Sequence, residues 1–386
     1  MKSNRRSFLL AGGLTALAAS RAIGANDSIR VGAIGCGGRM RDILSAADKA
    51  PGFELVAGCD VYGPRRDAIR ERTNELASTH LDYREVLDKK EIDAVFIATP
   101  NHWHVRIASD ALAAGKDVYL EKPVTHTMEE ADLLTRAVRE SKRILQCGMQ
   151  QRSWSHFQNA VELIQGGSLG RVTQIRTYWY QNYQGHPPVN HIDVDLLDWK
   201  RWLGSAPEQP YDEEKFRHWR WFWNFGGGAM TDLFTHWIDV VHWAMKSSEP
   251  KLVQTLGDRY VFDRWDCPDT IQSALRYPDF EVVYEGTMVS SIDDGGLEFR
   301  GTKGTLKIDR SQFGIYRERI TGANPVLTER SVEDGTIAHV QNFFDCVRDR
   351  KNPNAPIETG VTAARAGQLA NLALRRNNKV VWPLTA

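Results

Sequence analysis

The chain has few cysteines and no net charge, and each of these shortages excludes a class of protein. Only five cysteines occur among 386 residues, widely spaced and without a Cys-x-x-Cys pair. We expect them to be small buried residues rather than a disulfide framework. Lysine plus arginine number 49, as do aspartate plus glutamate. Without a net positive charge the chain is not expected to bind nucleic acid or an anionic membrane, and a small neutral partner fits better.

A long hydrophobic run is also missing, because the apolar stretch from Phe8 to Ala19 is too short to span a bilayer. It follows Asn-Arg-Arg-Ser at residues 4–7 and precedes small residues between Ala18 and Ala25, where cleavage could fall. The segment resembles a twin-arginine export signal; a basic tail with a chance apolar stretch is the alternative. The resemblance implies that residues 1–26 are signal and linker, and that the mature protein is periplasmic or otherwise exported and free of the membrane.

The first structural pattern is a short β-type run from Ile29, a glycine cluster, and a helical stretch to about Ala50. A strand, a glycine turn and a helix in this order place backbone N–H groups and a helix N-terminus against a pyrophosphate. Gly35 and Gly37 supply the first two glycines of Gly-x-Gly-x-x-Gly, with Gly38 as an extra glycine. Met40 occupies the third position, so the fingerprint is incomplete.

A second strand, Phe53 to Cys59, ends at Asp60, just over twenty residues beyond the glycine turn. An acidic side chain at this place would bond the adenosine ribose 2′-hydroxyl, which favours NAD. Arg65 and Arg66 follow closely and could instead hold a 2′-phosphate, so NADP stays open. Asp60 could also be an ordinary helix N-cap or turn residue.

Strands and helices continue to alternate to about residue 148, which predicts a parallel sheet with right-handed crossovers. The segments are the strands Ile92 to Thr99, Val118 to Leu120 and Arg143 to Cys147, and the helices His104 to Ala114 and Met128 to Glu140. Ligands bind such sheets at the carboxyl ends of the strands, where Gly35, Asp60, Pro100 and Lys122 fall. We therefore predict a dinucleotide-binding Rossmann domain over residues 27–148.

The second half, residues 149–386, has a different pattern. A helix is expected from Ser153 to Gln165, a long β-run from Arg171 to Tyr180, and an irregular stretch from Gln181 to Phe225. Five β-like runs between residues 251 and 319, separated by glycine-containing turns, predict a mostly antiparallel sheet. The fold class is thus α/β, a Rossmann domain followed by an α+β domain with a large open sheet.

Several of these segments together resemble the Gfo/Idh/MocA oxidoreductase family. The segments are the glycine turn, Ala98-Thr99-Pro100-Asn101-His102, Glu121-Lys122-Pro123, Gly148-Met149-Gln150-Gln151-Arg152, and Gly226 to Asp232 with His236 and Asp239. They run in family order and cover essentially everything after the export signal. The resemblance implies an oxidoreductase acting on sugars or polyols, with oligomers formed through the free face of the second sheet.

The resemblance also implies a catalytic set of Lys122, Asp232 and His236. Apolar residues at helical spacing between Ala229 and Ala244 place Asp232 and His236 on one helix face. A histidine of near-neutral pKa can take the hydroxyl proton as hydride leaves carbon, and the lysine can stabilise the alkoxide. Asp232 would orient the imidazole or share a substrate hydroxyl. An ordinary helix pair and a metal site completed by Asp239 or His242 are the alternatives, and no metal is expected.

Further residues are assigned to ligands by their place in these motifs. For the cofactor they are Gly35, Gly37, Gly38, Arg39, Met40, Asp60, Thr99, Pro100, Asn101, His104, Glu121 and Lys122. For a carbohydrate substrate they are His102, Gln150, Arg152, Tyr180, Asn182, His191 and Trp223. Tyr180 and Trp223 could stack on a sugar ring, but each residue of this second group could equally be a packing or loop residue.

The sequence therefore predicts an NAD(P)-dependent oxidoreductase that moves hydride to or from a hydroxyl carbon of a sugar or glycoside. Because free nicotinamide nucleotides should be scarce outside the cytoplasm, an exported enzyme would hold its cofactor tightly and recycle it with a second substrate. The alternative is an NAD-dependent glycosidase that works by transient oxidation, elimination and re-reduction. A sugar-binding protein without activity is a third option.

Overall fold

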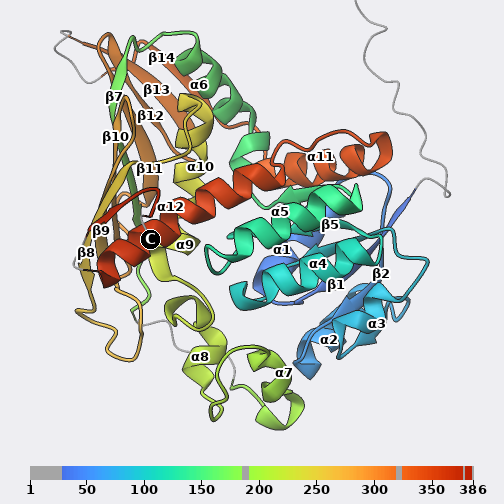
Figure 1. Cartoon of the computed structure of the whole chain (residues 1–386). Coiled ribbons are helices and arrows are strands. Elements are labelled where there is room, and N and C mark those ends of the chain that lie inside the picture. Colours follow the sequence, from blue (N-terminus) through green and yellow to red (C-terminus); the bar gives the residue numbers. More distant parts are fainter. Residues whose placement is uncertain (1–27, 185–190, 319–323, 377–378, 385–386) are drawn as a thin grey trace, which may run out of the picture.

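The structure is a computed structural model that describes residues 28–184, 191–318, 324–376 and 379–384. Two β-sheets lie side by side with helices on and between them, and the long helix α12 (Ile357–Arg375) contacts elements of both (Figure 1). The predicted export signal lies outside the described residues. All five cysteines are buried and unpaired, as predicted.

The first sheet has six parallel strands in the order β3-β2-β1-β4-β5-β6. Its strands are β1 (Ile29–Ile34), β2 (Phe53–Cys59), β3 (Ser78–His80), β4 (Ala94–Ile97), β5 (Asp117–Leu120) and β6 (Leu145–Cys147). Every residue of the central strands β4 and β5 is buried, because helices cover both faces. This is the strand order of a dinucleotide-binding Rossmann fold, so the predicted parallel sheet is confirmed.

Five helices follow these strands in the expected alternation. They are α1 (Gly38–Ala47), α2 (Gly63–Arg72), α3 (Tyr83–Leu87), α4 (His104–Ala113) and α5 (Glu130–Ser141). Helix α2, strand β3 and helix α3 were not among the predicted elements, and the last two are too short to show a periodicity in the sequence.

A helix from the far end of the chain completes the core of the first sheet. Helix α11 (Gly335–Asp349) packs beside α1. Its Phe343 and Phe344 contact the ring of Phe96 in β4, with centroid distances of 5.9 and 6.0 Å. Residues after 149 therefore do not all pack on the second sheet.

The second sheet has nine strands in the order β14-β13-β12-β11-β7-β10-β9-β8-β15. They are β7 (Val172–Tyr180), β8 (Leu252–Asp258), β9 (Thr270–Arg276), β10 (Glu281–Thr287), β11 (Gly295–Gly301), β12 (Gly304–Ile308), β13 (Gln312–Arg317), β14 (Leu327–Arg330) and β15 (Lys379–Val381). Every neighbouring pair is antiparallel except β7 with β10. Residues of β9 alternate between buried and exposed, as in a sheet with one covered face. The predicted open, mostly antiparallel sheet is confirmed.

Helices cover one face of this sheet and shorter ones lead from it toward the first sheet (Figure 1). The longer helices besides α12 are α6 (Ser155–Gln165) and α10 (Phe234–Met245). The short ones are η3 (Gln150–Ser153), η4 (Val194–Leu196), α7 (Trp199–Leu203), α8 (Glu213–Arg217), η5 (Trp219–Trp221) and α9 (Gly228–Asp232), while a further short helix, η2 (Asn101–Trp103), lies between β4 and α4 in the first domain. Most of them lie in the stretch predicted as irregular.

The helix predicted from Ala229 to Ala244 is two helices. α9 ends at Asp232 and α10 begins at Phe234, with Leu233 between them. The backbone N–H of His236 bonds the Leu233 carbonyl three residues back, at 3.2 Å. The apolar spacing of the segment is helical throughout, so the sequence pattern does not reveal this break.

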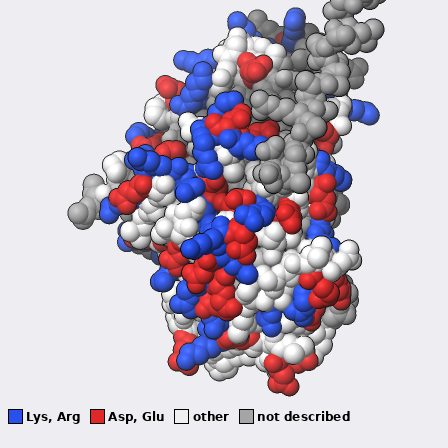
Figure 2. All heavy atoms as spheres, turned by 90° about the vertical axis from the view of Figure 1, so that its right-hand side faces the viewer, with Lys and Arg blue, Asp and Glu red and all other residues white. Residues whose placement is uncertain are grey.

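The surface bears the balanced charge of the sequence. On the face shown in Figure 2, acidic and basic side chains are intermixed. Among the helices of the described residues, none combines the length and apolarity needed to cross a membrane.

Candidate active site

The glycine turn after β1 has the backbone that a dinucleotide requires. Gly35 has φ +81°, and a Cβ there would lie 2.8 Å from the backbone nitrogen of Thr99, so a side chain is excluded on both counts. Gly37 and Gly38 begin helix α1, and both line a cavity. Met40, in place of the third glycine, is fully buried in the core beneath α1.

Asp60 ends β2 beside this turn. Its carboxylate accepts hydrogen bonds from the backbone N–H groups of Cys36 at 2.8 Å and Tyr62 at 2.9 Å. Arg65 lies 3.6 Å from the same carboxylate, while Arg66 donates to the Asp60 carbonyl at 2.7 Å. Asp60 therefore shapes the turn and also borders the cavity, so its two predicted roles are compatible.

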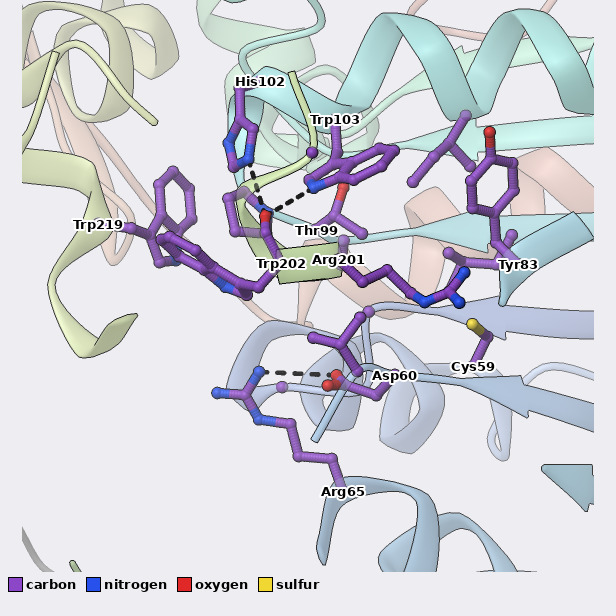
Figure 3. Close-up of a pocket in the computed structure, with 18 of the residues that line it drawn as sticks. Cys59, Asp60, Arg65, Tyr83, Thr99, His102, Trp103, Arg201, Trp202 and Trp219 are labelled. Carbon is purple, nitrogen blue, oxygen red and sulfur yellow. Dashed lines mark hydrogen bonds and ion pairs between the residues drawn. The ribbon is translucent and has the colours of Figure 1, made fainter. Parts of the chain in front are cut away.

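A cavity of about 710 Å³ lies over the carboxyl ends of the first sheet. Figure 3 shows Asp60 and Arg65 on one side of it and Trp202 and Trp219 on the other. Thr99 and Pro100 also line it. One wall thus comes from the Rossmann domain and the other from the stretch that precedes α9.

This second wall, residues 191–221, is held tightly against the first domain. The Trp202 carbonyl accepts hydrogen bonds from Trp103 Nε1 at 2.9 Å and His102 Nε2 at 3.1 Å (Figure 3). A Cβ on Gly204 would lie 2.3 Å from the Trp103 ring, which shows how closely the two segments approach. We call residues 191–221 the wall segment.

Lys122 and Asp232 meet across the domains at the end of β5. The Lys122 ammonium donates to the Asp232 carboxylate at 2.7 Å and to its carbonyl at 2.8 Å. Arg220 of the wall segment donates to the same carboxylate at 3.3 Å. Burial and then Arg220 lower the pKa of Lys122 despite the opposing effect of Asp232. An ammonium has three N–H donors, so one remains for a ligand.

His236 lies near this pair but does not bond Asp232. Neither of its ring nitrogens has a hydrogen-bond partner among the described residues, and Nδ1 is fully buried. The ring stacks on Trp179 at a centroid distance of 5.8 Å and an angle of 25°. Burial, followed by the positive charges of Lys122, Arg310 and Arg39, holds the pKa of His236 well below 6.5. The imidazole is therefore neutral at pH 7 and can accept a proton.

Glu121 joins the glycine turn to the catalytic residues. It is buried and accepts hydrogen bonds from Arg39 Nε at 2.8 Å and from Gln150 Nε2 at 3.0 Å. Burial opposes its ionisation, but Arg39 and Lys122 outweigh this and lower the pKa of Glu121. Arg39 also lines the cavity, so the cofactor cleft and the catalytic residues are contiguous.

Two other residues assigned to the cofactor are enclosed by protein. His104 Nδ1 lies 2.7 Å from the Pro123 carbonyl and Nε2 lies 2.9 Å from the Thr99 carbonyl, so the ring connects two strand ends. Asn101 is buried, and its side-chain oxygen has no partner among the described residues. Their cofactor contacts stay predictions.

The residues assigned to the substrate do not form one group. His102 and Gln150 lie at the site, as described above. Arg152 forms a bidentate ion pair with Asp239, with nitrogen–oxygen distances of 2.8 to 3.0 Å. The Trp223 ring lies 5.7 Å from the guanidinium carbon of Arg375.

The remaining three contact other residues of the second domain. Tyr180 ends β7 beside Tyr178, Asn182 accepts a hydrogen bond from the Gln184 backbone, and the exposed His191 pairs with Glu213 at 3.2 Å. Alternation along β7 places Tyr180 and Trp179 on opposite faces, and it is Trp179 that stacks on His236.

Sequence reasoning missed Trp179, Arg220 and Arg310 at this site. Strand alternation could have separated Trp179 from Tyr180, but the partners of the two arginines depend on tertiary contacts. The three glycines at residues 226–228 lie close to other parts of the protein: a Cβ on Gly228, for example, would lie 2.7 Å from Cys267 Cβ.

A metal centre has no support in the described part of the chain, which contains no group of three or more histidine, cysteine, aspartate or glutamate side chains placed to hold an ion. Asp239 is engaged by Arg152, and His242 bonds the Tyr277 hydroxyl at 2.7 Å.

Comparison with known proteins gives matches over both domains. Residues 29–149 match the oxidoreductase family with an NAD-binding Rossmann fold, and residues 157–307 match the GFO/IDH/MocA C-terminal domain. A solved levoglucosan dehydrogenase, in complex with NADH and levoglucosan, superposes with a TM-score of 0.75 over 92% of this chain and 100% of that one, at 19% identity. At this identity the likeness concerns the fold.

Two curated relatives match about half of this chain. Levoglucosan dehydrogenase of Pseudarthrobacter phenanthrenivorans is 29% identical over 190 residues, 47% of this chain and 42% of that protein. Inositol 2-dehydrogenase of Salmonella paratyphi B is 27% identical over 183 residues, 46% of this chain and 54% of that protein. The chain thus aligns with only about half the length of either relative.

Replacing Arg152 with alanine is expected to lower the free energy of unfolding by about 3–5 kcal/mol, because it leaves Asp239 as a buried, unpaired carboxylate. Urea unfolding followed by tryptophan fluorescence measures the change. The double variant Arg152→Met, Asp239→Leu removes both charges and should recover most of the stability. Unchanged stability with a raised KM would instead support the substrate role predicted from the sequence.

Proposed function

The chain belongs to the Gfo/Idh/MocA family of NAD-binding oxidoreductases, and we propose that it moves hydride to or from a hydroxyl carbon of a sugar or glycoside. The observation that carries the proposal is the pairing of two groups at the end of β5. One is the Lys122 ammonium, with one donor left after Asp232 has taken two. The other is the neutral, unbonded imidazole of His236.

The residues around the cavity fit NAD. A glycine turn that excludes side chains leads into the N-terminus of α1, which suits a pyrophosphate. The Thr99 hydroxyl is buried without a partner among the described residues, as expected of a group that meets a ligand. Asp60 would bond the ribose hydroxyls. Arg65 is paired with this carboxylate and Arg66 with the Asp60 carbonyl, so both guanidinium groups are already engaged and we propose NAD rather than NADP as the preferred cofactor.

When bound, the nicotinamide supplies or accepts the hydride. His236 takes the proton of the substrate hydroxyl, because its lowered pKa keeps it neutral before the reaction. The free N–H of Lys122 donates to the same oxygen and stabilises the negative charge that develops there. Asp232 holds Lys122 in place and does not orient the imidazole.

A sugar is the proposed substrate class because the relatives described above are named for levoglucosan and inositol. The dehydrogenase names also make the glycosidase alternative the less favoured one. Product analysis separates the two: a keto-sugar or lactone marks a dehydrogenase, and a released aglycone with an unoxidised sugar marks a glycosidase. We propose His102 and Gln150 as substrate contacts. We do not include Tyr180, Asn182, His191 and Trp223, whose described contacts are with other parts of the protein.

We propose from the sequence that the segment at residues 4–10 directs export of the protein. The close packing of the wall segment against the Rossmann domain fits this proposal, because an exported enzyme must retain its cofactor. A wall packed against the Rossmann domain would slow the exchange of a bound dinucleotide. An enzyme of this kind can fold around NAD in the cytoplasm and carry it outside.

The open face of the second sheet is proposed to contact a second copy. Glu298 is buried on this face although helices cover only the other one, and it is bound by Arg176, Arg300 and Lys307. Light scattering should therefore give twice the chain mass or more, and a strictly monomeric chain would contradict the proposal.

His236→Ala and Lys122→Met should each lower the rate of hydride transfer by about 100-fold or more, because each removes a group that acts on the hydroxyl proton or oxygen. Single-turnover absorbance in the nicotinamide band, with the best sugar from a panel, measures the rate. Cofactor affinity should be retained. Full activity in either variant would disprove the mechanism.

For the native enzyme, kcat/KM for oxidation should not fall as the pH is lowered from 8 to 6.5, because the pKa of His236 lies well below 6.5.

Cell fractionation should find the chain outside the cytoplasm, and the double variant Arg5→Lys, Arg6→Lys should stay inside.

The unsubstituted protein should also retain its cofactor. Mass spectrometry after purification without added cofactor and denaturation should detect near-stoichiometric NAD(H).

The role of the wall is tested by Trp219→Ala, which should lower the retained NAD(H), with Trp243→Ala outside the cavity lining as the control. Native protein purified empty would contradict cofactor retention but leave hydride transfer untouched.

A further inference from the structure

Arg310 is a cation without an anionic partner at the edge of the catalytic site. It lies in the turn between β12 and β13, and its guanidinium makes no hydrogen bond or ion pair with any described residue. The guanidinium carbon is 4.8 Å from the ring centroid of Trp179. Trp179 stacks in turn on His236, so one indole ring links the arginine to the catalytic histidine.

Arg310 is surrounded by protein on one side, where its guanidinium lies near the rings of Trp179 and Trp237, and by solvent on the other. The residue is exposed to solvent, yet burial and the nearby Arg39 lower its pKa to about 10. It is therefore still charged at pH 7. Asp294 and Glu121 favour this charge only through space, since neither is within ion-pair distance.

The carboxylates near the catalytic residues are already in use. Glu121 is held by Arg39, and Asp232 is held by Lys122 and a second arginine. Three cations thus share two carboxylates, and Arg310 adds a further positive charge. The catalytic corner therefore has an excess of positive charge although the whole chain has none.

Of these four cations, Arg39 and Arg220 line the cofactor cavity, whereas Arg310 lies on the substrate side of the site. Arg310, in a turn between two strands of the second sheet, and Trp179, in β7, belong to the second domain, whereas the glycine turn and Asp60 belong to the first. Arg310 is also absent from the lining of the cofactor cavity.

We propose that the substrate is an acidic sugar, with a carboxylate that binds Arg310 while a hydroxyl of the sugar meets His236 and Lys122. The inference rests on the proposed function and narrows it to uronic or aldonic acid units. A guanidinium donates two parallel N–H bonds to a carboxylate, so the contact is directional as well as charged. A neutral sugar would leave Arg310 without a counter-ion.

The test compares matched sugars that differ only in charge. Methyl glucoside with methyl glucuronide, and methyl galactoside with methyl galacturonide, each exchange a hydroxymethyl group for a carboxylate. The native enzyme should have the higher kcat/KM for the acidic member of at least one pair. In Arg310→Gln, this value should fall about tenfold more than the value for the neutral member, as expected for loss of a charge-assisted hydrogen bond.

Two further variants act as controls. Arg310→Lys keeps the charge without the fork and should recover part of the preference. Arg330→Gln removes the same charge from an exposed position on β14 and should leave the preference unchanged. An equal loss of kcat/KM for the acidic and the neutral sugar in Arg310→Gln would overturn the inference. A loss of NAD affinity in this variant would also overturn it, because Arg310 would then bind the cofactor.

Equilibrium binding separates this inference from the proposed reaction. Calorimetric titration of the NAD-loaded protein with glucuronate and galacturonate should show binding that weakens with added salt and in Arg310→Gln. Binding of this kind without turnover of any sugar would refute hydride transfer but support the acidic ligand. Turnover of neutral sugars without a preference for the acids would support hydride transfer but refute the acidic substrate.

Discussion

The contact between Lys122 and Asp232 is the interaction on which the arrangement of the site depends. It joins the end of β5 in the first domain to the end of α9 in the second, at 2.7 Å. The same carboxylate takes Arg220 from the wall segment, so one side chain connects the catalytic lysine, the second domain and the wall of the cofactor cavity. Movement of Asp232 would disturb all three at once.

A buried ion pair of this kind adds little to stability, because the loss of hydration offsets most of the attraction between the charges. Burial lowers the pKa of Lys122, as does Arg220, and burial also acts against the ionised form of Asp232. Lys122 and Arg220 together reverse that effect on Asp232, whose pKa is lowered. The pair is better explained by chemistry than by folding, since it fixes an ammonium where an alkoxide would form.

Much of the first domain could be predicted from the sequence because its rules are local. Buried β-type runs, glycine turns and alternating helices specify a parallel sheet, and strand ends in such a sheet converge on one edge. Gly35, Asp60 and Thr99 meet there for that reason. The role of α11 could not be predicted, because its packing against Phe96 joins segments more than two hundred residues apart.

Predictions for the second domain were weaker at individual side chains. In β7, Val172 and Ile175 are both buried although they are three residues apart, and the pairing with β11 shifts register opposite Val172. An irregularity of this kind breaks the two-residue period near Val172. Counted from Val172, alternation would wrongly turn Tyr180 toward the helices, whereas counted from Ile175 it correctly selects Trp179.

The break at Leu233 explains why the spacing of Asp232 and His236 was only partly informative. On one continuous helix the carboxylate would lie beside the imidazole and raise its pKa. The break directs Asp232 to Lys122 instead, and His236 is left buried among positive charges. Burial first, and these charges second, lower its pKa and keep it neutral. The negative charge of Asp232 thus lies beside Lys122, which must donate a hydrogen bond. No such charge lies beside His236, which must be neutral to accept a proton. Both halves of the proposed chemistry depend on this single interruption of a helix.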